Sequence, residues 1–182
     1  MAASIEQKKM LSLARKAIEQ YFSKSDENLL AESTSAMKEK RGAFVTLHKH
    51  GQLRGCIGYI EAFMPLDQAV AELAVKAAIE DPRFPSMEKE ELDEIDIEIS
   101  VLTPLERIDD PEKVIIGQHG LYLKSGFASG LLLPQVATQY GWDRETFLEQ
   151  TCWKAGLPSN AWKEADTEIY TFSAEIFGEK DA

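Results

Sequence analysis

Apolar residues recur at helical spacing in two long segments of the chain. The first segment, 10–21, follows a Ser and a Gln that have the spacing of a capping box at 4–7. The second, 66–77, directly follows a proline, which suits the first turn of a helix, and it ends before an Asp-Pro pair. The pattern predicts two long amphipathic helices, with two further helices over 134–140 and 143–155.

Alternation of apolar and polar side chains marks the strands. Segments 43–49 and 52–60 flank His50-Gly51, a dipeptide that favours a two-residue hairpin turn. Segment 95–101 alternates strictly, as a half-buried strand does. Shorter strands are predicted at 114–116, 121–124, 130–133 and 169–177, with a loop over 104–111. Because strands and helices mix without βαβ alternation, we expect an α+β fold whose mainly antiparallel sheet is flanked by helices.

Charge narrows the possible functions of a chain that is otherwise ordinary in composition. Of its 182 residues 44% are hydrophobic, and 20 Lys and Arg stand against 31 Asp and Glu, a net charge of −11. Such a protein lacks the basic face that grips nucleic-acid phosphates, and it repels anionic lipids. With no signal peptide and no apolar stretch of spanning length, we expect a cytoplasmic protein that binds neither nucleic acid nor membrane.

Metal and cofactor sites find little support in the sequence. The two cysteines form no C-x-x-C spacing, so we expect no metal and no cofactor. His48 and His50, beside the hairpin turn, are the remaining candidate ligands. With an unbroken hairpin register, Val45 opposes Cys56 and His48 opposes Leu53. His48 would then lie on the sheet face away from the thiol, which disfavours a shared metal site.

The segment Leu53-Arg54-Gly55-Cys56-Ile57-Gly58 has the most unusual composition among the predicted strands. Alternation puts Arg54, Cys56 and Gly58 on one face. A guanidinium two residues from a thiol favours the thiolate, and a glycine beside the thiol leaves room for a ligand. Gly55 and Gly58 also weaken the strand, which often marks a bulge or a site. The alternative is a small, inert cysteine in the core, with glycines that serve packing.

This segment resembles the signature of the AMMECR family, whose prokaryotic members are called AmmeMemoRadiSam system protein A. Further matching segments extend over nearly the whole chain, about 5–177, and together they are highly specific. They are Phe44–Leu47, Asp81–Phe84, Ser100–Thr103, His119-Gly120, Leu133–Ala137 and Cys152–Pro158. Gln135 stands where human-type members carry Glu, so no acid role is carried over to it.

The resemblance implies one domain over 5–177, with 1–4 and 178–182 as terminal tails. It also implies an α+β protein with a larger and a smaller lobe and a cleft between them, near the strand that carries Arg54 and Cys56. The family has no established biochemical activity, so whether the chain is an enzyme stays open. The name of the family implies two partners, a Memo-like protein related to non-haem dioxygenases and a radical-SAM protein.

Three further polar residues are candidate ligand-binding groups. Arg83 follows the second predicted helix, where it could bind a carboxylate or phosphate through two hydrogen bonds, or pair with one of the acids at 80–81. Glu98 and Ser100 share the polar face of their strand and either orient a ligand or face water. These residues join Arg54, Gly55 and Gly58 as predicted ligand contacts.

Two functional hypotheses follow. In the first, a cleft around this strand holds a small-molecule or protein-modifying activity, with Cys56 as thiolate, Arg54 as its electrostatic partner and His119 as base. His119 could instead simply fix its glycine-flanked turn. Any radical step belongs to a partner, because the chain lacks three clustered cysteines. In the second hypothesis, the chain is a non-enzymatic module that binds its partners through the same strand.

A local excess of positive charge precedes the cysteine. Residues 38–54 hold Lys38, Lys40, Arg41, Lys49 and Arg54 against Glu39 alone, a net of +4 without the histidines. A positive spot on an acidic protein attracts small anions. It is too small to bind a nucleic-acid duplex, but it suits a carboxylate, a phosphate or an acidic partner.

Overall fold

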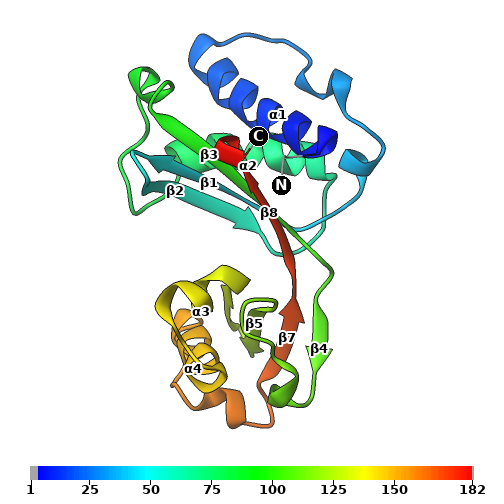
Figure 1. Ribbon diagram of the computed structural model, residues 1–182, viewed down its shortest axis with the longest axis vertical. Coiled ribbons are helices and arrows are strands. Elements are labelled where there is room, and N and C mark those ends of the chain that lie inside the picture. Colours follow the sequence, from blue (N-terminus) through cyan, green and yellow to red (C-terminus); the bar gives the residue numbers. More distant parts are fainter. Residues whose placement is uncertain (1–3, 182) are drawn as a thin grey trace. The chain divides into compact units, whose positions relative to one another are not determined.

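The computed structural model describes residues 4–181, which divide into a larger and a smaller compact unit (Figure 1). The larger unit holds residues 4–102 and 175–181, and the smaller unit holds 103–174. Each unit contains a four-stranded sheet with helices against it. The α+β class with antiparallel strands, expected from the sequence, is confirmed.

The sheet of the larger unit has the strand order β2-β1-β3-β8, so β2 lies at an edge. Its strands are β1 (Ala43–Lys49), β2 (Gln52–Tyr59), β3 (Ile95–Leu102) and β8 (Ala174–Gly178). The helices are α1 (Ile5–Ser23), which contacts β3, and α2 (Leu66–Ile79), which contacts β1 and β2. Short 3-10 turns lie at Leu29–Glu32, Ala36–Lys38, Lys89–Glu91 and Glu179–Asp181.

The capping box predicted for α1 is confirmed. The Ser4 hydroxyl accepts the Gln7 backbone N–H at 3.2 Å, and the Gln7 side chain accepts the Ser4 N–H at 2.6 Å. These bonds satisfy two of the donors that a helix start leaves open. Among residues 4–181, neither α1 nor any other helix is long and apolar enough to cross a membrane.

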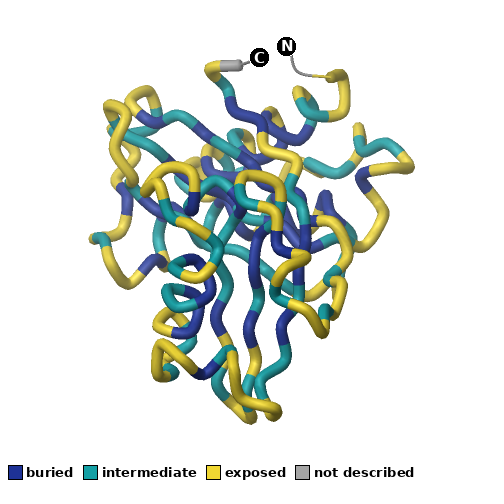
Figure 2. The backbone as a smooth tube through the Cα atoms, turned by 60° about the horizontal axis from the view of Figure 1, so that its bottom comes forward, coloured by how far each residue is buried: buried dark blue, intermediate teal, exposed yellow. Residues whose placement is uncertain are grey.

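The core of the larger unit lies between the sheet and its two helices. Buried parts of the backbone are dark blue in Figure 2. Val45, Leu47, Ile97 and Ile99 point to the helices and are all buried, as alternation along β1 and β3 requires. They meet the apolar stripes of α1 and α2 that the sequence pattern predicts. The opposite face of this sheet carries the intervening, more polar residues of the same strands.

The sheet of the smaller unit has the order β4-β7-β5-β6. Its strands are β4 (Glu106–Ile108), β5 (Gly120–Ser125), β6 (Ala128–Leu132) and β7 (Glu168–Phe172), with helices α3 (Pro134–Tyr140) and α4 (Arg144–Lys154) and 3-10 turns at Pro111–Lys113 and Ala161–Lys163. Helix α4 packs on β5 and β6, and the Asp143 carboxylate caps its start. Phe147, Leu121, Leu123 and Cys152 are fully buried between them.

Three predicted elements differ in the structure. Residues 114–116 form no strand, because the chain leaves a 3-10 turn and enters another turn in which Gly117 has a φ of 82°. The loop expected over 104–111 contains β4, which pairs with β7. The single strand expected over 169–177 is two strands, β7 and β8, that belong to different sheets. They separate at Ser173, whose backbone bonds to Thr103.

The hairpin of β1 and β2 has its predicted two-residue turn but not its predicted register. His50 and Gly51 both have positive φ, at 52° and 79°, as the turn requires. His48 opposes Leu53 as expected, but Leu47 opposes Gly55, so Arg54 is an extra residue in a bulge. Beyond the bulge every pair shifts by one position, which the sequence pattern alone does not reveal.

Candidate functional site

The bulge places Cys56 opposite Thr46 instead of the predicted Val45. Glu98 lies on the other side of Thr46, so Cys56, Thr46 and Glu98 form a row across three strands. Gly58, Phe44 and Ser100 form a second row, and Leu53, His48 and Asp96 a third. These rows lie on the sheet face away from α1 and α2. We call this surface the Cys56 face, defined by Phe44, Thr46, His48, Cys56, Gly58, Asp96, Glu98 and Ser100.

Four predicted site residues therefore come together, and one prediction about histidine is wrong. Cys56, Gly58, Glu98 and Ser100 share the Cys56 face in neighbouring rows. His48 lies on this face too, not on the opposite one. The extra residue in the bulge pairs Cys56 with Thr46, and Thr46 and His48 are two residues apart on β1, so their side chains point to the same side of the sheet. Among residues 4–181, no group of three or more His, Cys, Asp or Glu side chains is arranged to hold a metal ion.

The Cys56 thiol is half-buried and has a hydrogen-bond partner on the neighbouring strand. The Thr46 hydroxyl lies 3.1 Å from the Cys56 sulfur and forms a hydrogen bond with it. Burial raises the pKa of the Cys56 thiol, and the Thr46 hydrogen bond and the charge of Arg83 offset only part of this rise. The arginine whose charge lowers the pKa of Cys56 is Arg83 and not the expected Arg54, and its effect is smaller than that of burial.

Arg54 forms an ion pair with Glu91 and has no contact with the Cys56 thiol among the hydrogen bonds of residues 4–181. Its Nε and Nη2 groups bind the two carboxylate oxygens of Glu91 at 3.0 and 2.9 Å, and only 12% of its side chain is exposed. Lys49, on the helix side of β1, binds the same carboxylate at 3.1 Å. The hydrogen bonds from Arg54 lower the pKa of Glu91 to about 2, against an opposing effect of burial. The bulge thus turns Arg54 away from the thiol and into an ion pair at the end of the hairpin.

Gly55 and Gly58 each make room for a neighbour within the larger unit. A Cβ on Gly55 would lie 2.0 Å from the Ala77 carbonyl oxygen, so glycine lets α2 approach β2. A Cβ on Gly58 would lie 2.1 Å from Cδ1 of Phe44, whose ring covers this position. The space that the sequence suggested for a ligand beside Gly58 is therefore filled by Phe44.

Asp81 and Arg83 close the outer edge of β2 at Cys56; we call them the edge pair. The Asp81 carboxylate accepts the Cys56 backbone N–H at 2.9 Å. Arg83 binds Asp81 through Nε at 3.0 Å and Nη2 at 2.7 Å, and Nη2 also reaches the Cys56 carbonyl at 3.4 Å. The edge pair thus takes the place of a neighbouring strand at this position.

The two members of the edge pair differ in exposure. The Asp81 side chain is 2% exposed, whereas that of Arg83 is 52% exposed. Hydrogen bonds from Arg83 hold the pKa of Asp81 well below its ordinary value, so the carboxylate stays charged although it is buried. The alternative in which Arg83 pairs with an acid of the preceding turn is confirmed. Sequence reasoning missed that Asp81 also binds the strand that carries the thiol.

The remaining polar residues of the Cys56 face have unequal surroundings. Glu98 is half-buried, and its charge adds to the rise in the pKa of Cys56. Ser100 is buried, and its hydroxyl has no hydrogen-bond partner within residues 4–181. Since buried hydroxyls are normally bonded, this group is a candidate for an interaction with a ligand.

His119 belongs to the smaller unit, in the turn that precedes β5. Its Nδ1 atom accepts a hydrogen bond from the backbone N–H of Ile115 at 3.2 Å. The backbone N–H of His119 donates to the Ile115 carbonyl at 2.9 Å. These contacts support the interpretation in which His119 fixes its turn. Its role as a base for Cys56 stays a prediction.

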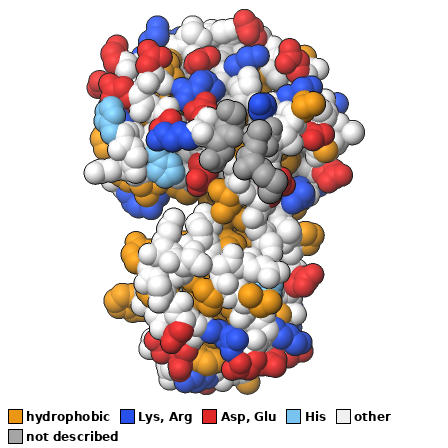
Figure 3. Space-filling model, viewed as in Figure 1, with side chains coloured by type: hydrophobic (Ala, Val, Ile, Leu, Met, Phe, Trp, Pro, Cys, Tyr) orange, Lys and Arg blue, Asp and Glu red, His pale blue; other side chains and the backbone are white. Residues whose placement is uncertain are grey.

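The basic stretch predicted over 38–54 is partly neutralised. Lys49 binds Glu91 and Glu94, and Arg54 binds Glu91. Acidic and basic side chains are accordingly interspersed over the surface seen in Figure 3. At Cys56 the exposed positive group is Arg83, which lies outside the stretch.

Comparison with known proteins agrees with the resemblance drawn from the motifs. The family model AMMECR1 matches residues 11–177. A protein of Thermococcus gammatolerans is 48% identical over 94% of this chain and 89% of its own length, and one of Methanothermobacter thermautotrophicus is 47% identical over 96% and 94%. The crystal structure of the uncharacterized protein PH0010 from Pyrococcus horikoshii matches with a TM-score of 0.89 and 43% identity, over 94% of this chain and 90% of that one.

Proposed function

The chain belongs to the AMMECR1 family, and we propose that it is a binding module that recognises an anionic group of a partner protein at the edge pair, beside the Cys56 face. The observation that carries this proposal is the edge pair. A buried carboxylate fixes a half-exposed guanidinium against the backbone of Cys56. A charged donor held in one orientation loses little entropy when it binds a ligand, so it favours recognition.

The chemistry of Arg83 suits a carboxylate. Within residues 4–181 its hydrogen bonds use Nε and Nη2, which leaves Nη1 for a further acceptor. Guanidinium groups bind carboxylates more strongly than neutral donors do, because both partners are charged. The Thr46–Cys56 pair offers further polar groups on the adjoining sheet face. The partners proposed for this surface are the Memo-like and radical-SAM proteins that the family resemblance implies.

A thiol-dependent activity is the second candidate. The charge of Arg83 lowers the pKa of Cys56, and the thiol is not fully buried. Burial and the charges of Asp81 and Glu98 act in the opposite direction, and together they hold the pKa of Cys56 above its ordinary value. Because the thiolate is the nucleophile, this balance favours binding over catalysis.

The cellular location belongs to the same proposal. Cys56 and Cys152 are both free thiols. Thiols stay reduced in the cytoplasm, so we propose a cytoplasmic location.

Co-purification tests the proposal directly. A tagged form of the chain is co-expressed with the Memo-like and radical-SAM proteins of the same organism, and recovery of each is measured for wild type, Arg83→Gln and Arg107→Gln. Arg107 is a matched control, since it is 57% exposed and also pairs with one acid, Glu168. We expect Arg83→Gln to reduce recovery at least tenfold and Arg107→Gln to leave it unchanged.

Two outcomes would overturn the proposal. If neither protein is recovered with the wild type, the Cys56 face does not bind these partners. If Arg83→Gln recovers as much of both as wild type, the edge pair is not the contact. Thermal unfolding of Arg83→Gln, measured alongside, distinguishes loss of binding from loss of the fold.

A further inference from the structure

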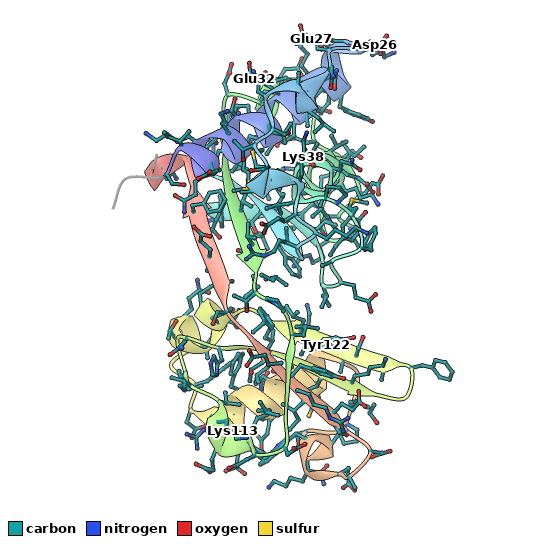
Figure 4. All side chains as sticks on the ribbon, turned by 90° about the vertical axis from the view of Figure 1, so that its right-hand side faces the viewer. Asp26, Glu27, Glu32, Lys38, Lys113 and Tyr122 are labelled. Carbon is teal, nitrogen blue, oxygen red and sulfur yellow. The ribbon has the colours of Figure 1, made fainter. Side chains whose placement is uncertain are left out.

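A second candidate site lies in the larger unit, in a groove between α1 and the segment 29–37. The cavity has a volume of about 270 Å³. It shares no residue with the Cys56 face, so it is a site distinct from the proposed function. Figure 4 labels Glu32 where this segment runs beside α1. We call this cavity the α1 groove.

The floor of the α1 groove is apolar. Leu13 from α1 and Met37 from the facing segment are buried at its base, and Leu29 lines it from the side. Ile5 lies at one end, where it is 75% exposed. An exposed isoleucine extends the buried apolar floor to the surface. Covering this surface with an apolar group is favourable, because it removes apolar area from water.

The rim of the α1 groove is basic, although the protein as a whole is acidic. Lys8, Lys9 and Lys16 line it, against Glu32 alone. Lys9 donates to the Glu32 backbone carbonyl at 3.2 Å and so ties α1 to the segment. Lys8 and Lys16 are exposed and form no ion pair within residues 4–181. Two turns of helix separate the backbone positions of these two lysines along one side of the groove, and their long, flexible side chains can turn toward one another.

Ser33 adds a hydrogen-bonding group. It lines the groove, and its hydroxyl has no hydrogen-bond partner within residues 4–181. A polar atom withdrawn from solvent without a partner costs free energy, which a ligand oxygen would offset. The hydroxyl and the lysine rim both favour an acceptor that carries negative charge.

We propose that the α1 groove binds a small carboxylate with an apolar tail. The carboxylate lies between the ammonium groups of Lys8 and Lys16 and accepts a hydrogen bond from Ser33, while the tail covers Leu13, Leu29 and Met37. The volume of about 270 Å³ lies just below the range of roughly 300–1,000 Å³ that is usual for ligand pockets, so the ligand is smaller than a typical drug molecule. A positive rim on a protein of net charge −11 selects such an anion against neutral and cationic analogues.

Nuclear magnetic resonance of methionine methyl groups tests the groove. The full chain is labelled with ¹³C-methyl methionine and titrated with octanoate, with octanol and octylamine as neutral and cationic controls. Met37 lines the groove, whereas Met64 and Met87 do not and serve as internal references. We expect a saturable shift of the Met37 signal with octanoate that weakens at high salt, and none with octylamine.

Matched variants locate the charge that binds. Lys8→Gln/Lys16→Gln should weaken octanoate binding about tenfold, as expected for two partly screened charge contacts, and Ser33→Ala two- to threefold. Lys38→Gln/Lys89→Gln removes the same charge from exposed positions outside the groove and should leave the affinity unchanged. An unmoved Met37 signal would overturn the proposal, as would equal binding of octanol or an equal loss in both lysine pairs. None of these results depends on the Cys56 face.

Discussion

The two sides of strand β2 use the same kinds of residue in different ways. On the helix side, Gly55 admits the backbone of α2, and Arg54 binds Glu91 with only 12% of its side chain exposed. On the edge beside the Cys56 face, Arg83 binds Asp81 through two bonds as well, yet 52% of its side chain is exposed. The comparison shows that Arg54 is held inside the fold whereas Arg83 stays half-exposed, as the proposed recognition of an anionic group requires.

The largest effect expected from this comparison is on Gly55. Gly55→Ala places a Cβ 2.0 Å from a backbone oxygen of α2, which cannot move without the helix, so we expect a loss of about 3 kcal/mol in the free energy of unfolding. Gly58→Ala meets only the Phe44 ring, which can rotate, and should cost about 1 kcal/mol. Urea unfolding at neutral pH measures both, and equal losses would contradict the assignment of Gly55 to the helix side.

A smaller effect, with a defined pH dependence, is expected for Glu91. Its pKa falls from an ordinary 4.5 to about 2 in the folded chain, so its contribution is complete above pH 4.5 and disappears as the pH falls toward 2. Glu91→Gln should therefore lower the free energy of unfolding by about 2 kcal/mol at pH 7. In urea unfolding from pH 7 to pH 2, the free energies of unfolding of wild type and Glu91→Gln should converge. A difference that stays constant with pH would show that Glu91 acts through packing.

Of the two ion pairs, the one formed by Arg83 is expected to contribute less to stability. Arg83→Gln removes two bonds from Asp81, but the carboxylate still accepts the backbone N–H groups of Cys56 and Arg83. Because the guanidinium is half-exposed, we expect a loss of only about 1 kcal/mol at pH 7. Differential scanning calorimetry measures this loss. A loss as large as that of Glu91→Gln would make Arg83 a second structural arginine and remove the contrast between the two sides.

Much of the fold was predictable because the apolar pattern is strong. The stripe of α1, the stripe of α2 and the alternation of β3 each fix which side of the element is buried, and all three predictions are confirmed. The turn at His50-Gly51 was also predictable from its residue types. The division of 169–177 into two strands was not predictable, since the apolar pattern continues through Ser173. Only the pairing of β7 and β8 with different sheets separates the two strands.

The candidate site was harder to predict because one residue changes its geometry. Perfect alternation puts Arg54 and Cys56 on one face, but the bulge at Arg54 sends the two side chains to different surroundings. A glycine after Arg54 hinted at a bulge without locating it. Which arginine lies beside Cys56 also depends on partners distant in sequence. Glu91 binds Arg54, whereas Asp81 holds Arg83 against Cys56.

The protonation state of Cys56 decides most directly between the two candidate functions, because a nucleophilic cysteine needs a thiolate, whereas recognition through Arg83 does not. The rate of iodoacetamide alkylation of Cys56 is measured against pH in a Cys152→Ala background, which removes the other thiol. We predict a midpoint above that of a free thiol, about 8.5, since burial raises the pKa of Cys56. A midpoint well below this value would contradict the account and favour a nucleophilic cysteine.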